Sequence, residues 1–173
     1  MKLRKYLAAA VSICMLVCAV PFTVLADPDG PNELLHYIDA SYGDHTCDDY
    51  TVVSSDMTQL TSGWYAVTEN TDLPDRLNIS GNVNLILCDD TTLNANKGIG
   101  LNKGNSLTIW CQEGKNGALN ATGGSVLSGY STVGLPGIGS NSNIEAGTLT
   151  VNGGVINAGC RAVYYGSRRY YPR

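Results

Sequence analysis

A short phrase that recurs three times constrains the fold of this chain more than any other feature of its sequence. Each copy has a small or β-branched residue, an aliphatic residue, Asn and Ala, and the copies are Thr92–Ala95, Ala118–Ala121 and Val155–Ala158. An alternating apolar run precedes each copy, and glycine follows it. The copies lie 26 and 37 residues apart. Solenoid repeats span about 20 to 45 residues, so this spacing predicts stacked coils with one insertion.

Alternation within the apolar runs predicts which side chains form the core. Side chains two residues apart in a strand share a face, so like residues of successive coils should stack inward. The expected inward pairs are 77/79, 85/87, 107/109 and 149/151. We therefore predict an all-β fold, a right-handed parallel β-helix (β-solenoid) of few coils with an N-terminal cap segment.

The polar and Gly-rich segments are expected to form the corners of these coils. Asn94, Asn120 and Asn157 should stack at a corner and bond to turn backbone groups. Residues 122–147 are predicted to form an irregular loop rich in Gly, Ser and Asn, in which Ile138 enters the core.

Composition divides the chain into four segments. Residues 1–26 are interpreted as a secretory signal peptide, because a basic start and an apolar stretch precede Val24-Leu25-Ala26. Residues 27–49 are expected to form a linker and N-terminal cap, since an open solenoid end exposes unpaired strand edges. Residues 50–160 are expected to form the β-helix domain. Residues 161–173 break the repeat, and we interpret this irregular tail as the product of a truncation or frameshift.

Charge and cysteine content limit the partners and the compartment. Without the signal, eight Lys and Arg residues oppose fifteen Asp and Glu residues. Nucleic acid and anionic membranes are bound by basic surfaces, so neither is an expected partner of the mature protein. We expect a secreted protein, extracellular or attached to the cell surface.

Four cysteines follow the signal: Cys47, Cys88, Cys111 and Cys160. Export permits disulfides, and four cysteines allow three pairings among which the sequence does not choose. Counted along their runs, Cys88 and Cys111 fall one place out of register. They should therefore lie on opposite strand faces, which disfavours a bridge between them.

Several ordered segments carry a resemblance to a known class of proteins. They are 63–67, 76–88, 97–99, 105–109, 137–139 and 147–154. Together they resemble a recurring module of exported surface proteins of gut Gram-positive bacteria, described as carbohydrate-binding-domain-containing or pectate-lyase-like β-helix proteins. The resemblance covers roughly residues 60–160 and implies the fold and a surface location. It supplies no catalytic motif that could be carried over.

The expected function is a non-catalytic module that contacts polysaccharide or another extracellular partner. Sugar binding needs aromatic faces, and Trp110 and Tyr130 are the candidates. Counted from inward-facing Leu107 and Ile109, Trp110 should project from the surface, where a large aromatic residue points to a partner.

Two alternatives remain open at this stage. A lyase-like enzyme would hold calcium as its cofactor at Asp89 and Asp90, and would use Arg76, Lys97 or Lys103 as its base. A structural stalk segment or truncated gene product would have no ligand, although its open last coil could associate end to end with a second copy.

Overall fold

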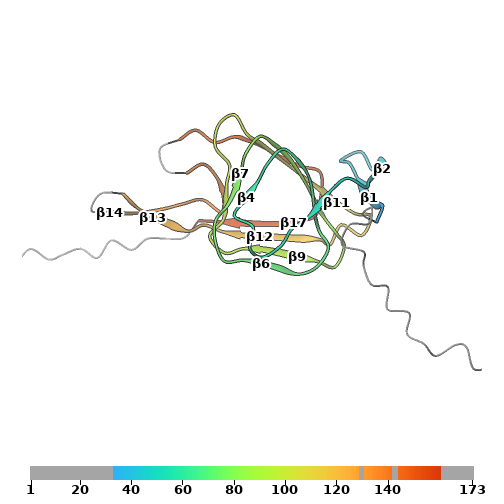
Figure 1. Cartoon of the computed structure of the whole chain (residues 1–173), viewed down its shortest axis with the longest axis horizontal. Coiled ribbons are helices and arrows are strands. Elements are labelled where there is room, and N and C mark those ends of the chain that lie inside the picture. Colours follow the sequence, from blue (N-terminus) through green and yellow to red (C-terminus); the bar gives the residue numbers. More distant parts are fainter. Residues whose placement is uncertain (1–32, 129–130, 142–143, 161–173) are drawn as a thin grey trace, which may run out of the picture. The chain divides into compact units, whose positions relative to one another are not determined.

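The structure, a computed structural model, describes residues 33–128, 131–141 and 144–160. These residues are all-β, and none of them is helical (Figure 1), which confirms the predicted all-β class. The proposed signal peptide, residues 27–32 of the cap segment and the tail from residue 161 lie outside the described residues. Within the described part of the chain, no helix has the length and apolar character to cross a membrane.

Three main sheets contain most of the strands. Sheet A has the order β2 (Asp44–Cys47), β1 (Leu35–Ile38), β11 (Ser106–Cys111), β8 (Asn82–Leu87), β5 (Gly63–Val67) and β3 (Thr51–Val52), and β16 (Thr148–Val151) also pairs with β11. Sheet B has the order β15 (Ile138–Gly139), β10 (Ile99–Gly100), β7 (Leu77–Ile79) and β4 (Gln59–Leu60). Sheet C has the order β17 (Val155–Gly159), β12 (Ala118–Thr122), β9 (Thr92–Ala95) and β6 (Thr71–Leu73).

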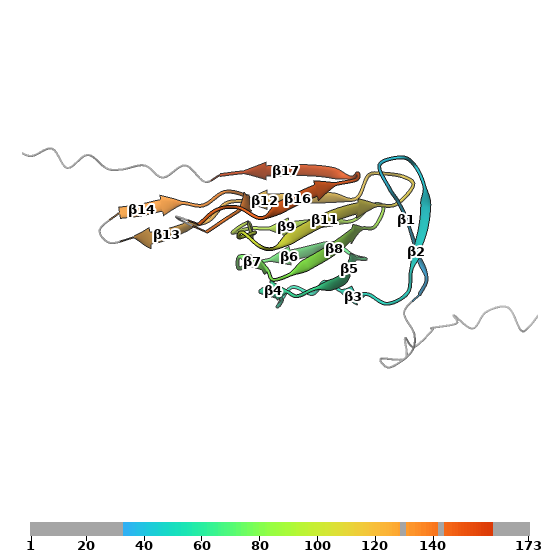
Figure 2. The ribbon, with the colours of Figure 1, turned by 90° about the horizontal axis from the view of Figure 1, so that it is seen from above.

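The chain passes through these sheets in a fixed order. From β5 onward it visits sheets A, C and B in turn, and it does so repeatedly up to β17. We call one such passage a circuit. Strands of successive circuits pair in parallel, whereas β1 is antiparallel to both β2 and β11, so sheet A is mixed. Figure 2 shows the strands of successive circuits lying one above another, with β1 and β2 running along their side.

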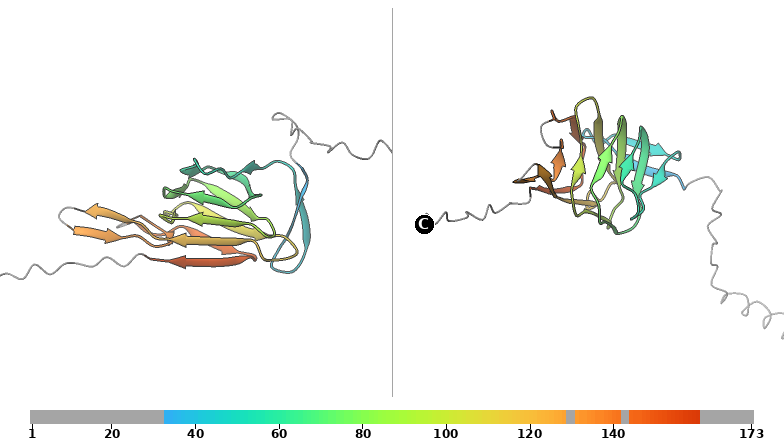
Figure 3. Two further views of the ribbon diagram at one scale, coloured as in Figure 1. Left: turned by 90° about the horizontal axis from the view of Figure 1, so that it is seen from below. Right: turned by 60° about the vertical axis from the view of Figure 1, so that its left-hand side comes forward.

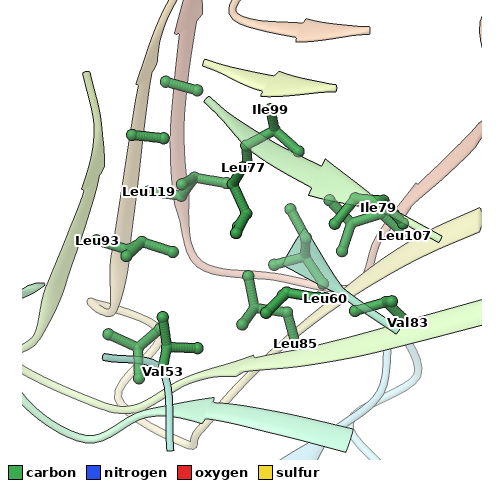
Figure 4. Packing of buried hydrophobic residues seen from close by; sticks show 14 of the residues in the cluster. Val53, Leu60, Leu77, Ile79, Val83, Leu85, Leu93, Ile99, Leu107 and Leu119 are labelled. Atoms are coloured by element: carbon green, nitrogen blue, oxygen red, sulfur yellow. The ribbon is translucent and has the colours of Figure 1, made fainter. Parts of the chain in front are cut away.

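The main core fills the space between the three sheets (Figure 4). The side chains at 77, 79, 85, 87, 107 and 109 are buried, as the alternation predicts. Leu149 and Val151 occupy equivalent positions but are 42% and 45% exposed, because no described strand lies beyond β16. Ile138 also packs against this core, as expected for the glycine-flanked bend that contains it.

The pairing register differs in one place from the simplest reading of the repeats. Leu107 lies opposite Val83 rather than Leu85, and Leu85 lies opposite Ile109. A shift of two residues keeps every side chain on its own face, so alternation alone does not detect it. Cys111 lies opposite Leu87, one place from Cys88, which agrees with the expected offset of the two cysteines.

The stacked asparagines occupy strands and not corners. Asn94, Asn120 and Asn157 align in sheet C, and the Nδ2 of each donates to the Oδ1 of the preceding side chain at 2.8 to 2.9 Å, beginning from Asp72. We call this row the amide ladder. The prediction of stacking is therefore confirmed. The predicted corner location is wrong, because all three lie within strands, where Asn94 and Asn120 alternate with buried neighbours and face outward.

The insertion also contains regular structure that the sequence analysis missed. Residues 122–147 include the antiparallel hairpin of β13 (Ser125–Ser128) and β14 (Ser131–Gly134) in place of an irregular loop. Figure 3 shows this hairpin extending away from the main sheets. The two strands pair with each other and with no other described strand, so the pattern of inward stacking could not reveal them.

Gly137 lies where two backbone segments approach each other closely. A Cβ at this position would lie 2.2 Å from the carbonyl oxygen of Ala121. Only glycine allows so close a backbone approach without displacement of its neighbours.

Candidate ligand-binding groove

The predicted sugar platform, Trp110, faces outward but packs under the N-terminal hairpin. Its ring lies 5.8 Å from that of Trp64 and 5.1 Å from that of Tyr37, between centroids. Its Nε1 donates to Asn84 Oδ1 at 3.1 Å. The hairpin thus takes up ring surface that a sugar would need. Tyr130, the second predicted platform, lies outside the described residues.

This contact makes a second apolar cluster on the outer face of sheet A. Its buried members are Tyr37, Cys47, Tyr50, Ala66, Ile86 and Cys88, with Leu35, Trp64 and Trp110 packed against them. The segment predicted as a cap therefore covers the side of several circuits. Leu35 and Tyr37 of β1 contact this cluster, while His36 between them is exposed.

The loop between β1 and β2 presents one aromatic side chain to solvent. Tyr42 is 73% exposed and has a φ of 65°, in the left-handed region that non-glycine residues seldom occupy. Asp39 holds the loop, because its Oδ1 accepts hydrogen bonds from the backbone amides of Ser41 and Gly43 at 2.8 and 2.9 Å. His45 lies 3.1 Å from the other carboxylate oxygen. Bonds from His45 and then from these amides hold the pKa of Asp39 below its usual value.

A groove of about 630 Å³ lies between this hairpin and the turn that joins β11 to β12. Its lining combines aromatic, charged and apolar side chains: His36, Tyr37, Ile38, Tyr42, Asp44, Glu113 and Lys115. The volume is in the range of small-molecule sites, about 300 to 1,000 Å³. The Lys115 ammonium lies 3.4 Å from the centre of the Tyr42 ring. Both walls of the groove therefore meet at this cation–π contact.

Asp89, one of the two predicted calcium ligands, supports the second wall of the groove. Its Oδ2 accepts a bond from the Gly114 amide at 2.8 Å, and its own amide donates to Gln112 Oε1 at 2.9 Å. Gln112 in turn donates through Nε2 to the carbonyl of His36 at 3.1 Å. This chain of bonds joins the turn of Glu113 and Lys115 to β1.

The fit of Asp89 and Asp90 to calcium is poor. Calcium takes about six to eight oxygen ligands. Asp90 Oδ1 already accepts a bond from Asn116 Nδ2 at 2.6 Å, and Asp89 Oδ1 is the buried side-chain oxygen without a hydrogen-bond partner. The described residues contain no group of three or more His, Cys, Asp or Glu side chains able to hold a metal ion. Calcium binding at this turn stays a prediction.

The three candidate bases of a lyase are all engaged in other contacts. Arg76 donates five hydrogen bonds, one to the Asn141 side chain and four to the carbonyls of Lys97, Ile99, Pro136 and Gly139. Burial lowers the pKa of its guanidinium. Lys97 pairs with Asp75 and Lys103 with Glu145, each at 2.6 Å. Arg76 thus joins circuits of sheet B, while both lysines lie at exposed ion pairs.

Cysteines 47, 88, 111 and 160 are unpaired thiols in this structure. Cys88 belongs to the outer cluster with Cys47, whereas Cys111 is buried opposite inward-facing Leu87. Cys88 and Cys111 therefore lie on different faces, as the sequence predicts. Cys160 is exposed after β17.

No protein-family model matches the chain, and no curated protein or solved structure matches it. The residues of the groove come from segments more than 60 positions apart, and the sequence analysis did not bring them together. The available signal was local: Asp39-Ala40-Ser41-Tyr42-Gly43 has turn composition between two short apolar runs. This composition predicts a turn but not the residues that the turn lies against.

Proposed function

We propose that the protein is a secreted, non-catalytic module that contacts polysaccharide through the groove beside Tyr42. The exposed ring of Tyr42 carries this proposal, because it stands at the edge of a groove lined by carboxylates and a lysine. An aromatic face and a few polar groups are the combination by which proteins hold a sugar ring. The proposed contact site thus replaces Trp110 with Tyr42.

We also propose that the circuits are coils of a short right-handed parallel β-helix. Parallel pairing between successive circuits in all three sheets supports this, as does the buried core that they enclose. The right hand follows from the strong preference of parallel crossover connections. The resemblance to pectate-lyase-like surface proteins of gut bacteria is part of the same proposal.

A non-catalytic role is favoured by the contacts of the charged residues. A lyase base must reach the proton next to a sugar carboxylate. Arg76 has its five donors directed to protein oxygens, and Lys97 and Lys103 face their own ion-pair partners. Polysaccharide, or failing that an extracellular protein, is the proposed partner, and nucleic acid and membranes are not.

The proposal is tested by binding of residues 27–173 to a polysaccharide array, with calcium and with a chelator. We expect retention without release of unsaturated sugar, and at least about fivefold weaker binding for Tyr42→Ala, the scale of one lost ring contact. Tyr42→Phe keeps the ring and should bind like the wild type. Release of unsaturated sugar would establish the lyase alternative, and absence of retention on every glycan would favour the structural stalk.

A further inference from the structure

We propose that the groove is selective for glycans whose sugars carry free amino groups, and that it rejects polymers of uronic acids. This inference rests on the proposed function and names its ligand class. Two observations support it: the charges around the groove and the Lys115 ammonium over the Tyr42 ring.

The surroundings of the groove are acidic. Residues 33–49, which form one wall, contain five carboxylates and no lysine or arginine. The lining itself has two carboxylates, Asp44 and Glu113, against one ammonium, that of Lys115. Asp89 and Asp90 stand directly behind the second wall. A surface of one charge attracts ligands of the opposite charge and repels those of its own, so polyuronates are disfavoured here.

The contact between Lys115 and Tyr42 shows which chemical group the ring accepts. An ammonium 3.4 Å from the ring centre is an amine held by a π face, the interaction by which proteins bind ligand cations. A protonated sugar amine has the same charge and similar size. It could take this position, with its hydroxyl groups directed to the carboxylates of Asp44 and Glu113. In this arrangement Lys115 competes with the ligand and does not bind it.

The groove is also built to hold its shape. The hairpin wall is fixed by the bonds of Asp39 to the loop amides, and the opposite wall by the bonds of Asp89 and Gln112. A preformed site loses less conformational entropy when it binds. A flexible array of acidic residues on a surface would lack this property.

The test compares three oligosaccharide probes of equal length: glucosamine oligomers, their N-acetylated form and oligogalacturonate. Binding is measured by calorimetry at low ionic strength and about pH 6, where an amino sugar is largely protonated. We expect the glucosamine oligomers to bind at least about fivefold more tightly than the N-acetylated form, and oligogalacturonate not to bind. Tighter binding of oligogalacturonate, with calcium or without it, would overturn the inference while leaving the proposed function intact.

Two substitutions in the groove should change the affinity for glucosamine oligomers in opposite directions. Lys115→Met removes the competing ammonium and keeps the length of the side chain, so the glucosamine oligomers should bind about threefold more tightly. Glu113→Gln removes one attracting charge and should weaken the same binding about threefold. Lys103→Met and Glu145→Gln are matched controls, because they make the same changes at an exposed pair outside the groove.

The remaining outcomes separate this inference from the proposal on which it rests. Weaker binding of glucosamine oligomers by Lys115→Met would mean that Lys115 holds the ligand, and the competition argument would be wrong. Capture of oligolysine but of no sugar would show a groove for basic peptides and would contradict both proposals. Equal binding of the amino and N-acetyl forms would leave polysaccharide binding in place and remove the selectivity for amines.

Discussion

Asp39 ties the position of the Tyr42 ring to the ionisation of one carboxylate. Since bonding holds the pKa of Asp39 below its ordinary value, the loop gains stability from the ionised form. That contribution is fully present above the unfolded pKa of about 4 and is lost as the pH falls through the lowered folded value. The geometry of the groove should therefore be constant at neutral pH and change only in strong acid.

We expect the amide signals of Ser41 and Gly43 in NMR spectra to shift together below about pH 4, when Asp39 becomes protonated. In Asp39→Asn the same signals should not titrate, since a carboxamide neither gains nor loses a proton in that range. Titration of these signals near neutral pH, with no change below, would show that another group controls the loop.

Burial of the thiols governs how the cysteines react. Burial raises the pKa of Cys88 to about 11, and burial also raises the pKa of Cys47 and Cys111. The thiolate is the reactive form, so these three side chains should be inert in the native protein near pH 8. Exposed Cys160 should react freely.

Alkylation of residues 27–173 followed by mass spectrometry checks this expectation. We expect one modified cysteine in the native protein, Cys160, and four after addition of denaturant without reductant. Fewer than four in denaturant would show that disulfides form, and the masses of the linked peptides would identify the pairing.

At the scale of elements, the amide ladder joins successive strands of sheet C through their side chains. Asn120 takes part in two of its bonds, whereas Asn157 takes part in one with the described residues. A typical hydrogen bond contributes about 0.5 to 1.5 kcal/mol to stability. The cost of removing an amide should therefore depend on its place in the ladder.

We expect Asn120→Ala to lower the free energy of unfolding by about 1 to 2 kcal/mol, and Asn157→Ala by about half as much. Urea denaturation followed by circular dichroism measures both. Thr108→Ala, on the outer face of sheet A, is a control outside the ladder. Equal losses of unfolding free energy at Asn120 and Asn157 would mean that stability does not follow the number of ladder bonds that each side chain makes.

The elements most regular in sequence were also the most predictable. The expected inward pair 77/79 lies in β7, and the pair 85/87 lies in β8. Alternation with a period of two identifies such strands because one face is buried. The packing of Tyr37 on Trp64 and Trp110 could not be predicted in this way, since it joins segments distant in sequence. For the same reason the sequence analysis did not select Tyr42 as a site residue.

At the scale of the whole described fold, the first and last circuits differ in how well they are covered. Val53 and Leu60, near the first circuit, are buried, with Met57 packed against the same core. Leu149 and Val151 in the last described circuit remain partly exposed. End-to-end association of two copies, which the sequence suggested, would involve this last face. It stays a prediction.

The hairpin of β1 and β2 has a consequence for the order in which the fold assembles. A chain synthesised from its N-terminus delivers this hairpin first, yet Trp110, against which it packs, arrives more than 60 residues later. The earlier circuits, by contrast, bond to segments 20 to 26 residues away, and the last one to segments 37 to 42 residues away across the insertion. Short loops close faster than long ones. The segment that emerges first should therefore dock among the last, and one wall of the groove should form only when the coils behind it are in place.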